Sequence, residues 1–337
     1  MDTLSDVLNA VRLKGAVYFT VDASPPWVAE APAAQEIASA VMPGVQHLIE
    51  YHVVTRGTCW GGIVGEEPVR LSEGDVIVFP QGDAHVLSSA PGMRAAPDIG
   101  VYHQQQLPFT LTLGEGGPER VNLVCGFLGC DARPFNPLLE TLPRVLHVRE
   151  DRRGGDGWLG QLIRFTLSEA EGKCPGGDCV LAKVSELMFI EVVRRHLATL
   201  PPEQTGWLAG LRDGHVGRAL ALLHSDPAHP WTLEELAHEV GLSRSAFAER
   251  FTQLVGRPLM QYLTQWRMQV ATGLLSRGDA NVAEVALEVG YDSEAAFSRA
   301  FKRLVGTPPA AWRRQQPRQA SGGTWGRRGH PPTGRGL

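Results

Sequence analysis

The 337-residue sequence contains no apolar run of about 18 residues, so it offers no candidate for a transmembrane helix. Its first residues, Met1 to Asp6, start acidic, and no basic stretch followed by an apolar run marks a signal peptide. Five cysteines, an odd number, argue against a framework of disulfide bonds. We therefore expect a cytoplasmic protein without a membrane partner.

The sequence also lacks the strong positive charge of a generally basic nucleic-acid binder, because its formal net charge at pH 7 is −4. The charge is distributed unevenly along the chain. From Arg212 to the C-terminus there are 16 Lys and Arg residues against 11 Asp and Glu, whereas the preceding part has 16 against 25. A basic C-terminal part can contact DNA phosphates, whereas an acidic N-terminal part is repelled by them. This distribution fits a protein with one domain that binds DNA and a separate domain that senses a signal.

Short β-strands are predicted between Val45 and Cys130, where apolar runs are separated by Gly, Pro and Asp. The expected strands cover residues 46–56, 58–64, 68–71, 75–79, 84–89, 109–113 and 119–129. Another strand at 16–21 follows a short helix within residues 1–13. This pattern predicts a β-sandwich or barrel at the N-terminal end of the chain.

One turn in this region has an informative spacing, because Gly74, Pro80, Gly82 and His85 fit the pattern G-x5-P-x-G-x2-H. The stretch resembles the second motif of the cupins, which are small β-barrels, and this resemblance implies a histidine facing the barrel mouth. The segment from His52 to Gly57 resembles the end of the first cupin motif. We therefore predict that an unknown small-molecule effector is bound by His47, His52 and His85.

The first motif departs from the pattern of metal-binding cupins, which need a His-x-His pair and a Glu in one site with the later histidine. His47, Glu50 and His52 have the wrong spacing for three aligned ligands, although imidazoles suit divalent transition metals. We therefore expect no metal and no other cofactor. A cupin oxygenase would need a metal with open positions, so we also expect that the protein is not an enzyme.

The residues from 136 to 204 are predicted to link two domains through helices. Helical apolar spacing occurs at Gly157–Ala170 and again at Val180–Leu200, with a Gly/Pro-rich loop between them. Such a helix pair could form an antiparallel homodimer contact or pack against the barrel. The pattern does not decide between these two arrangements.

Four cysteines are candidates for redox sensing. Two of them, Cys125 and Cys130, lie on or beside a predicted strand, and two, Cys174 and Cys179, flank a Pro-Gly-Gly-Asp turn. A thiol reacts when it is exposed and partly ionised, and Lys173 would lower the pKa of its neighbour Cys174. The loop pair has reach for a disulfide or half a metal site. The alternative is that all four thiols are inert.

The C-terminal part of the chain repeats one pattern twice. Two phenylalanines, a glycine and a proline recur with a separation of 50 positions: Phe247 and Phe297, Phe251 and Phe301, Gly256 and Gly306, Pro258 and Pro308. Each copy reads as a helix ended by a glycine, a serine that can cap the next helix, and a second helix with Phe four residues apart. This is the layout of a helix-turn-helix. An α-solenoid is the alternative, but solenoids usually need three or more repeats.

The second copy resembles the signature of the AraC/XylS-type bacterial transcription regulators, which places Tyr291, Ser293, Phe297, Arg299 and Arg313 at matching positions. The resemblance covers residues 213 to 314. It implies two helix-turn-helix units on one linker helix, so that both recognition helices reach successive major grooves of double-stranded DNA. It also implies RNA polymerase as a partner of such an activator.

Matching the family motif position by position assigns the contacts with DNA. The residues expected on the recognition surfaces are Arg244, Ser245, Ala248, Glu249, Ser293, Glu294, Ala295, Ser298, Arg299 and Lys302. Arg299 suits bidentate pairing with guanine, and Glu249 can accept from cytosine. Arg244, Lys302 and Arg313 are expected to contact phosphates.

The expected fold is α+β, with a cupin-like sensor barrel at 1–135, a helical linker with a possible dimer contact at 136–204, and the AraC-type domain at 205–316. The Gly-, Pro- and Arg-rich tail at 317–337 is expected to be disordered. We predict a transcription regulator controlled by a small molecule, metal or oxidant. The alternative function is a metal-dependent cupin enzyme joined to a DNA-binding module.

Overall fold

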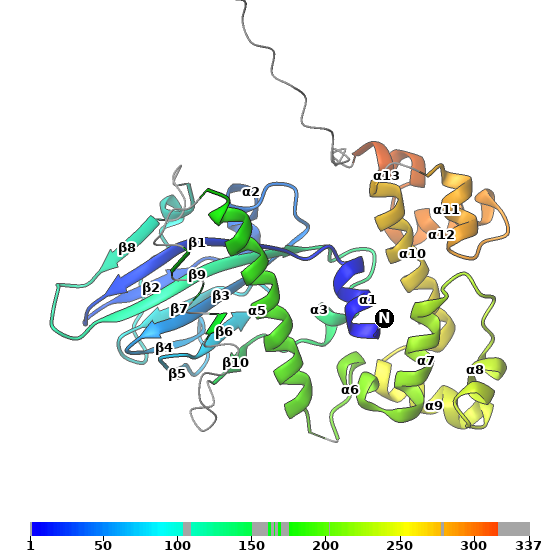
Figure 1. Cartoon of the computed structure of the whole chain (residues 1–337), viewed down its shortest axis with the longest axis horizontal. Helices are drawn as coiled ribbons and strands as arrows, with labels where there is room; N and C mark the ends of the chain where they lie inside the picture. Colours follow the sequence, from blue (N-terminus) through cyan, green and yellow to red (C-terminus); the bar gives the residue numbers. More distant parts are fainter. Residues whose placement is uncertain are drawn as a thin grey trace, which may run out of the picture.

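The computed structural model describes residues 2–103, 109–149, 161, 162, 165, 168, 169, 175–201, 203–277 and 280–315. A domain built on β-sheets lies beside a helical domain, and helix α5 runs along the sheet domain (Figure 1). Within this part of the chain, none of the helices combines the length and the hydropathy needed to cross a membrane. The first linker helix predicted at 157–170, Cys174 and the tail at 317–337 lie largely or wholly outside the described residues.

The strands of the N-terminal domain form two sheets. The larger sheet has six strands in the order β10-β6-β3-β9-β1-β8, and the smaller has four in the order β2-β7-β4-β5. Their bounds are β1 Lys14–Ala23, β2 Val28–Ala31, β3 His47–Arg56, β4 Thr58–Ile63, β5 Val69–Ser72, β6 Val76–Phe79, β7 His85–Ser88, β8 Phe109–Leu113, β9 Val121–Cys130 and β10 Leu146–Val148. All pairs are antiparallel except β1 with β8.

Of the sandwich and the barrel that the strand pattern predicts, the described strands form the sandwich, because they belong to two separate hydrogen-bonded sheets and do not close into one barrel. All eight predicted strands are present, and their ends lie within two residues of the expected ones. The shorter elements β2, β10, helix α2 (Ala34–Val41) and the 3-10 helix η1 (Ile99–His103) were not predicted. These elements have three to eight residues each, which is too few to show a clear periodicity.

The central strands β3 and β9 are buried on both faces, so each face packs against a different layer. Alternate residues of β3, Leu48 and Val54, face the core between the sheets, whereas Tyr51 and Val53 belong to a second core beneath the helices. The hydroxyl of Tyr51 lies 2.7 Å from the hydroxyl of Ser185 on α5 (Gly177–Thr199). Gly126 opposite Tyr51 is required there, because a Cβ atom would lie 2.3 Å from the Tyr51 hydroxyl oxygen.

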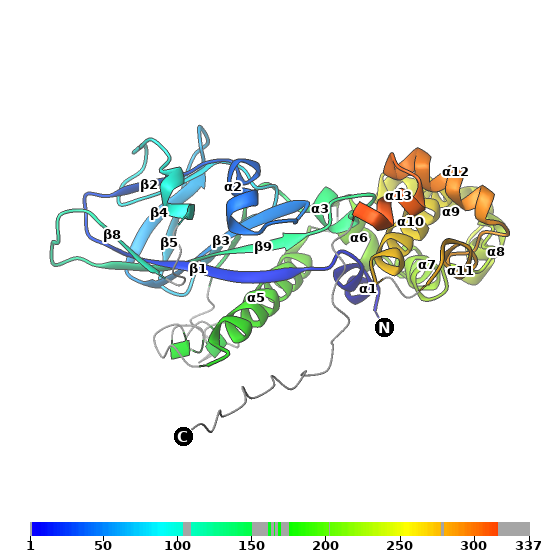
Figure 2. The same cartoon turned by 90° about the horizontal axis from the view of Figure 1, so that it is seen from above.

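The second core continues from the sheet into the C-terminal domain. It joins Val192 of α5 and Val7 of α1 (Thr3–Ala10) with Phe247 and Phe251 of the first repeat. Helix α1 and the short helix α3 (Pro137–Thr141) thus lie between the two domains (Figure 2). In the described chain α5 packs against the larger sheet, which agrees with the second of the two arrangements left open by the sequence.

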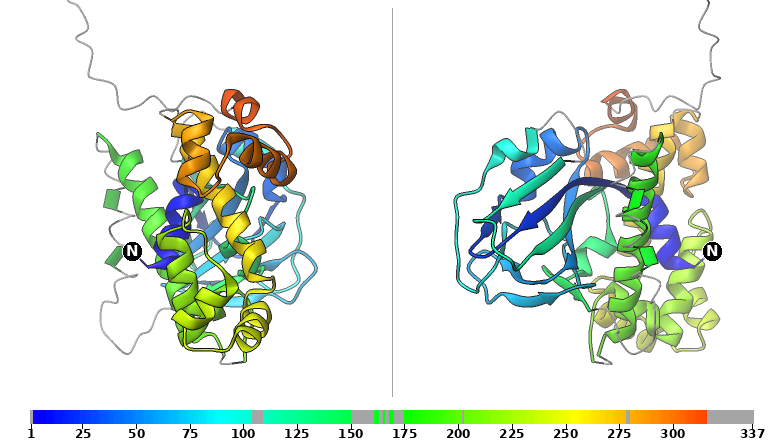
Figure 3. Two further views of the ribbon diagram at one scale, coloured as in Figure 1. Left: turned by 90° about the vertical axis from the view of Figure 1, so that its right-hand side faces the viewer. Right: turned by 60° about the vertical axis from the view of Figure 1, so that its left-hand side comes forward.

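The C-terminal domain consists of helices, and its second repeat has a core of its own. The helices are α6 Trp207–Arg212, α7 Gly214–Ser225, α8 Leu233–Glu239, α9 Arg244–Val255, α10 Leu259–Arg277, α11 Val282–Glu288, α12 Glu294–Val305 and α13 Pro309–Gln315. The long helix α10 connects the two repeats, as Figure 3 shows from two further sides. Met268 and Leu275 of α10 pack with Phe297 and Phe301 in a cluster separate from the first repeat.

Candidate DNA-binding surface and sensor cavity

Each repeat forms a helix-turn-helix, in which α8 and α9 make the first unit and α11 and α12 the second. The turns contain Gly241 and Gly290, which both have positive φ angles of 71° and 80°. Ser243 caps α9 by accepting a hydrogen bond from the N–H of Ala246. Ser293 caps α12 in the same way, by accepting a hydrogen bond from the N–H of Ala296. Its side chain therefore has a structural role at the start of the helix in addition to the predicted contact with DNA.

The faces of α9 and α12 divide as the sequence predicts. Phe247, Phe251, Phe297 and Phe301 are completely buried. The predicted contact residues lie on the other faces: Arg244, Ser245, Glu249, Ser293, Glu294, Ala295, Arg299 and Lys302 are exposed, and Ala248 and Ser298 are half-buried. The structure thus brings the ten candidates onto two surfaces, one for each recognition helix.

Among the described residues, neither Arg299 nor Lys302 has an ion-pair partner, so both charges are available for a ligand. The exposed Arg303 lies four residues after Arg299 on α12. Residues four apart share one side of a helix, so Arg303 extends the basic surface. This spacing was visible in the sequence, but the family signature drew attention to Arg299 and Lys302 instead.

Other arginines of the domain have structural roles. Arg250 of α9 makes an ion pair with Asp213, which caps α7. Arg313 donates a hydrogen bond to the carbonyl of Ala280 at 3.1 Å. The expectation that Arg313 contacts phosphate is therefore not supported, because its guanidinium joins α13 to the start of the second unit.

The N-terminal domain contains a cavity of about 150 Å³ between the two sheets. Its walls are mainly apolar and come from β1, β2, β7, β8 and η1, with lining side chains Phe19, Val21, Val28, Leu87, Tyr102, Leu111 and Leu113. Its lining also includes His52, His85 and Cys125, together with the acidic residues Glu30 and Asp98. This composition fits a small ligand with a mostly apolar surface.

The structure brings two of the three predicted effector residues together. His52 Nε2 and His85 Nε2 are 2.7 Å apart, and His85 Nδ1 lies 2.9 Å from the carbonyl oxygen of Asp83. Since a backbone carbonyl only accepts, His85 carries its proton on Nδ1 and accepts at Nε2 from His52. Burial lowers the pKa of His85 to about 4 and also lowers that of His52, so both rings are neutral at pH 7.

The structure does not bring His47 to this group, and His47 is not among the residues that line the cavity. Its ring nitrogen Nε2 lies 2.7 Å from the carbonyl oxygen of Pro80. Because successive side chains of a strand point to opposite faces, His47 shares its face with Tyr51 and not with His52. The period of two along β3 could have shown this from the sequence.

Glu50 is the third polar residue beside the two histidines, although it is not among the residues that line the cavity. It is 1% exposed, its Oε2 lies 3.9 Å from His85 Nε2, and burial raises its pKa to about 8. Two polar atoms of this cluster, Glu50 Oε1 and His52 Nδ1, have no hydrogen-bond partner among the described residues. A buried polar group without a partner is unfavourable, so these atoms are suited to recognise a ligand.

The residues of this cluster do not fit a metal ion as they are arranged. In the part of the chain that the structure describes, no group of three or more His, Cys, Asp or Glu side chains is placed to hold one. The two imidazoles share a proton at 2.7 Å, whereas nitrogens about 2.1 Å from a zinc ion at tetrahedral angles would be farther apart. The protonated Glu50 is not a ligand in this form.

Two of the four predicted redox cysteines are parts of the core. Cys125 and Cys130 are 2% and 4% exposed, and burial raises the pKa of both thiols, to about 12 for Cys130. Such thiols contain no appreciable thiolate at neutral pH, so the structure does not support them as sensors. Cys179 at the start of α5 is exposed and free, and Cys174 lies outside the described residues.

Two helix-turn-helix units on one connecting helix, joined to a double-sheet domain with an internal cavity, define a DNA-binding regulator with a separate N-terminal domain. Comparison with protein families supports this class. A cupin model matches residues 2–198, and a helix-turn-helix domain model matches residues 236–315.

Comparison with individual proteins identifies the family. A putative AraC-like transcription regulator of Streptomyces lividans is 34% identical over 319 residues, which is 93% of this chain and 98% of that protein. The regulator AlkR of Acinetobacter baylyi is 28% identical over 94% of this chain and 100% of its own length. The activator RclR of Escherichia coli is 28% identical over 80% of this chain and 86% of its own length. This chain belongs to the AraC-like transcription regulators and carries a cupin domain.

Proposed function

We propose that this regulator reads a specific DNA sequence with α9 and α12 in successive major grooves and that a small molecule in the N-terminal cavity controls it. The observation that carries the proposal is that both recognition helices expose the predicted contact residues and are connected by the single helix α10. Successive major grooves on one DNA face are about 34 Å apart, and one rigid connection between the units would fix their spacing.

The side chains on the two surfaces have different roles in this proposal. Arg299 pairs with guanine, and Glu249 accepts from cytosine. The methyl groups of Ala248 and Ala295 contact thymine. Arg244 and Lys302 neutralise phosphates, which supplies affinity without sequence information.

Replacing Arg299 by alanine is expected to weaken binding to the preferred operator by about 1–3 kcal/mol and to relax the preference at one base pair. Replacing Lys302 by alanine is expected to weaken binding to all sequences and to lower the salt slope by about one. The operator is selected from random DNA, and affinities are measured by fluorescence anisotropy at several salt concentrations. If both variants change affinity equally for every sequence, Arg299 does not read a base.

The proposed effector is small, uncharged and largely apolar, with one group that hydrogen-bonds. A cavity of about 150 Å³ is the size that holds benzene in other proteins. His52 Nδ1 can accept a hydrogen bond, because His52 donates through Nε2 to His85. A hydroxyl group beside His52, which lines the cavity, would give the unpartnered Nδ1 atom its missing hydrogen bond. Phenol is therefore a suitable probe.

Phenol is expected to raise the melting temperature of the wild-type protein and to change its operator affinity, but to have neither effect on Leu111→Trp. Leu111 lines the cavity, so a tryptophan there fills it. The control is Leu187→Trp, because Leu187 lies on α5 and is 45% exposed. The melting temperature and the anisotropy titration are recorded for all three proteins. An equal response of Leu111→Trp and wild type would place the ligand elsewhere.

A further inference from the structure

A second pocket lies at the junction of the two domains, apart from the cavity between the sheets. It has a volume of about 480 Å³, within the usual range for small-molecule sites. Its wall combines α1 and the residues after it, Lys183 of α5, His224 of α7 and one side of α10. A ligand in this pocket would therefore touch the cupin domain and the helix that connects the two DNA-reading units.

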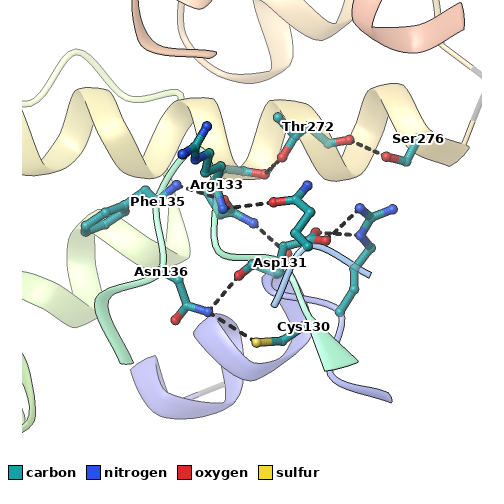
Figure 4. A network of polar contacts seen from close by, with 11 residues as sticks. Cys130, Asp131, Arg133, Phe135, Asn136, Thr272 and Ser276 are labelled. Atoms are coloured by element: carbon teal, nitrogen blue, oxygen red, sulfur yellow. Dashed lines mark hydrogen bonds and ion pairs between the residues drawn. The ribbon is translucent and has the colours of Figure 1, made fainter. Parts of the chain in front are cut away.

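The junction itself is closed by specific hydrogen bonds. Gln269 of α10 is completely buried, and its side chain donates to the carbonyl of Ala10 at 2.9 Å and accepts from the N–H of Phe135 at 3.2 Å. Figure 4 shows the adjoining network, in which the segment from Cys130 to Asn136 lies against the part of α10 with Thr272 and Ser276. Gln269 and Ser276 also line the pocket. The hydrogen bonds of Gln269 therefore fix the position of one part of the pocket wall.

Positive charge dominates the rim of the pocket. Its charged lining residues are Asp6, Arg12, Lys14, Lys183 and Arg277. Arg12 is neutralised by Asp131, and Lys183 by Glu186. Lys14 and Arg277 have no ion-pair partner among the residues that the structure describes, which leaves two cations opposed by one carboxylate.

The inner wall contains two buried N–H donors without acceptors. The hydroxyl of Tyr262 accepts from Trp207 Nε1 at 2.8 Å, so its own proton points to His224 Nε2 at 2.7 Å. His224, which burial keeps neutral by lowering its pKa to about 3, then carries its proton on Nδ1. His224 Nδ1 and the neighbouring Trp266 Nε1 both lack a partner among the described residues.

Gly273 gives an independent sign of a ligand. It lies within helix α10, where glycine is less favourable than alanine because of its backbone entropy. No packing contact requires it, since a Cβ atom at this position would meet nothing within 4 Å. Gly273 instead lines the pocket, where a missing side chain keeps space open beside the helix.

We propose that the junction pocket binds a small organic anion, with its acidic group against Lys14 and Arg277 and its body in the space beside Gly273. Two free cations and two N–H donors without acceptors all favour a negatively charged, hydrogen-bond-accepting ligand. The body of the anion packs against Leu13, Val270 and Leu274, which line the same pocket. This site is independent of the proposed effector cavity.

The test uses 4-bromobenzoate as a probe of the full-length protein. Isothermal titration calorimetry is expected to show binding at millimolar concentration or below for wild type and for Gly273→Ala, which adds only a methyl group in open space. Gly273→Phe fills the pocket and is expected to weaken binding by at least about tenfold. Arg277→Met, which leaves the pocket open, is expected to weaken it by a similar factor. Anomalous diffraction from bromine in soaked crystals is expected to place the probe beside α10.

Several results would overturn this site. The proposal fails if the probe does not bind wild type, or if Gly273→Phe and Arg277→Met bind it as well as Gly273→Ala does. Loss of binding in Leu111→Trp, with bromine between the sheets, would also refute it, although the proposed effector cavity would then be occupied. The two proposals can thus fail separately.

Discussion

Replacing Phe297 by alanine is expected to unfold the second helix-turn-helix unit while the rest of the chain stays folded. Phe297 is completely buried and lies against Tyr291 and Phe301, with ring centroids 5.6 and 5.5 Å away. Truncating a buried phenylalanine costs about 3–5 kcal/mol, which is comparable to the stability that a small domain has in total. The free energy of unfolding that remains for the second unit is therefore small.

The effect should be local because the two repeats do not share one core. Phe297 belongs to a cluster formed by one end of α10 with α11, α12 and α13. Phe247, which matches it in the first repeat, belongs to the core that extends through α1 and α5 to the larger sheet. Loss of Phe247 is therefore shared by a larger cooperative body, whereas loss of Phe297 is confined to the end of the chain.

Hydrogen exchange measured by mass spectrometry distinguishes the two cases. In Phe297→Ala, peptides from α11 and α12 should lose protection while peptides from α9 and β3 keep it. In the matched variant Phe247→Ala, both α9 and the sheet should become less protected. Equal loss of protection throughout the chain in the two variants would show that the repeats fold as one body.

This difference between the repeats illustrates what the sequence could predict. The separation of 50 positions placed both units, their caps and their buried phenylalanines correctly, because each depends on residues close together in the chain. The joining of the first unit to the cupin domain depends on pairs such as Gln269 and Ala10, which are far apart in sequence. No local pattern records such a contact.

In the N-terminal cavity, too, local sequence patterns predicted some features, whereas features that depend on distant contacts were missed. The strand pattern and the cupin-like turn placed His52 and His85 near one another, and the structure confirms their contact. Glu50 was noticed only as a misplaced metal ligand, because its role follows from burial and not from spacing. Two short unpredicted elements, β2 and η1, form part of the cavity wall, so its size could not be derived from the sequence.

Replacing Glu50 by glutamine is expected to stabilise the protein increasingly as the pH rises. The pKa of Glu50 is about 8 in the folded protein, whereas an unfolded glutamate titrates near 4.5. Between these values the unfolded chain is ionised at this position and the folded chain is protonated. Wild-type stability therefore falls by about 1.4 kcal/mol for each pH unit in this window, while glutamine contributes no such loss.

The comparison between pH 6.5 and 8 isolates Glu50, because His52 and His85 are neutral there in the folded state and their titration in the unfolded chain is common to both proteins and cancels in the difference. Denaturant unfolding of wild type and Glu50→Gln should give free energies of unfolding whose difference widens toward pH 8. Glu249→Gln is the matched control, since Glu249 is exposed on α9 and its difference from wild type should stay constant. A constant offset for Glu50→Gln as well would mean that Glu50 is already ionised at pH 6.5. In that case the carboxylate would offer a ligand only acceptor atoms, and an effector with a hydroxyl donor would be favoured over one that accepts.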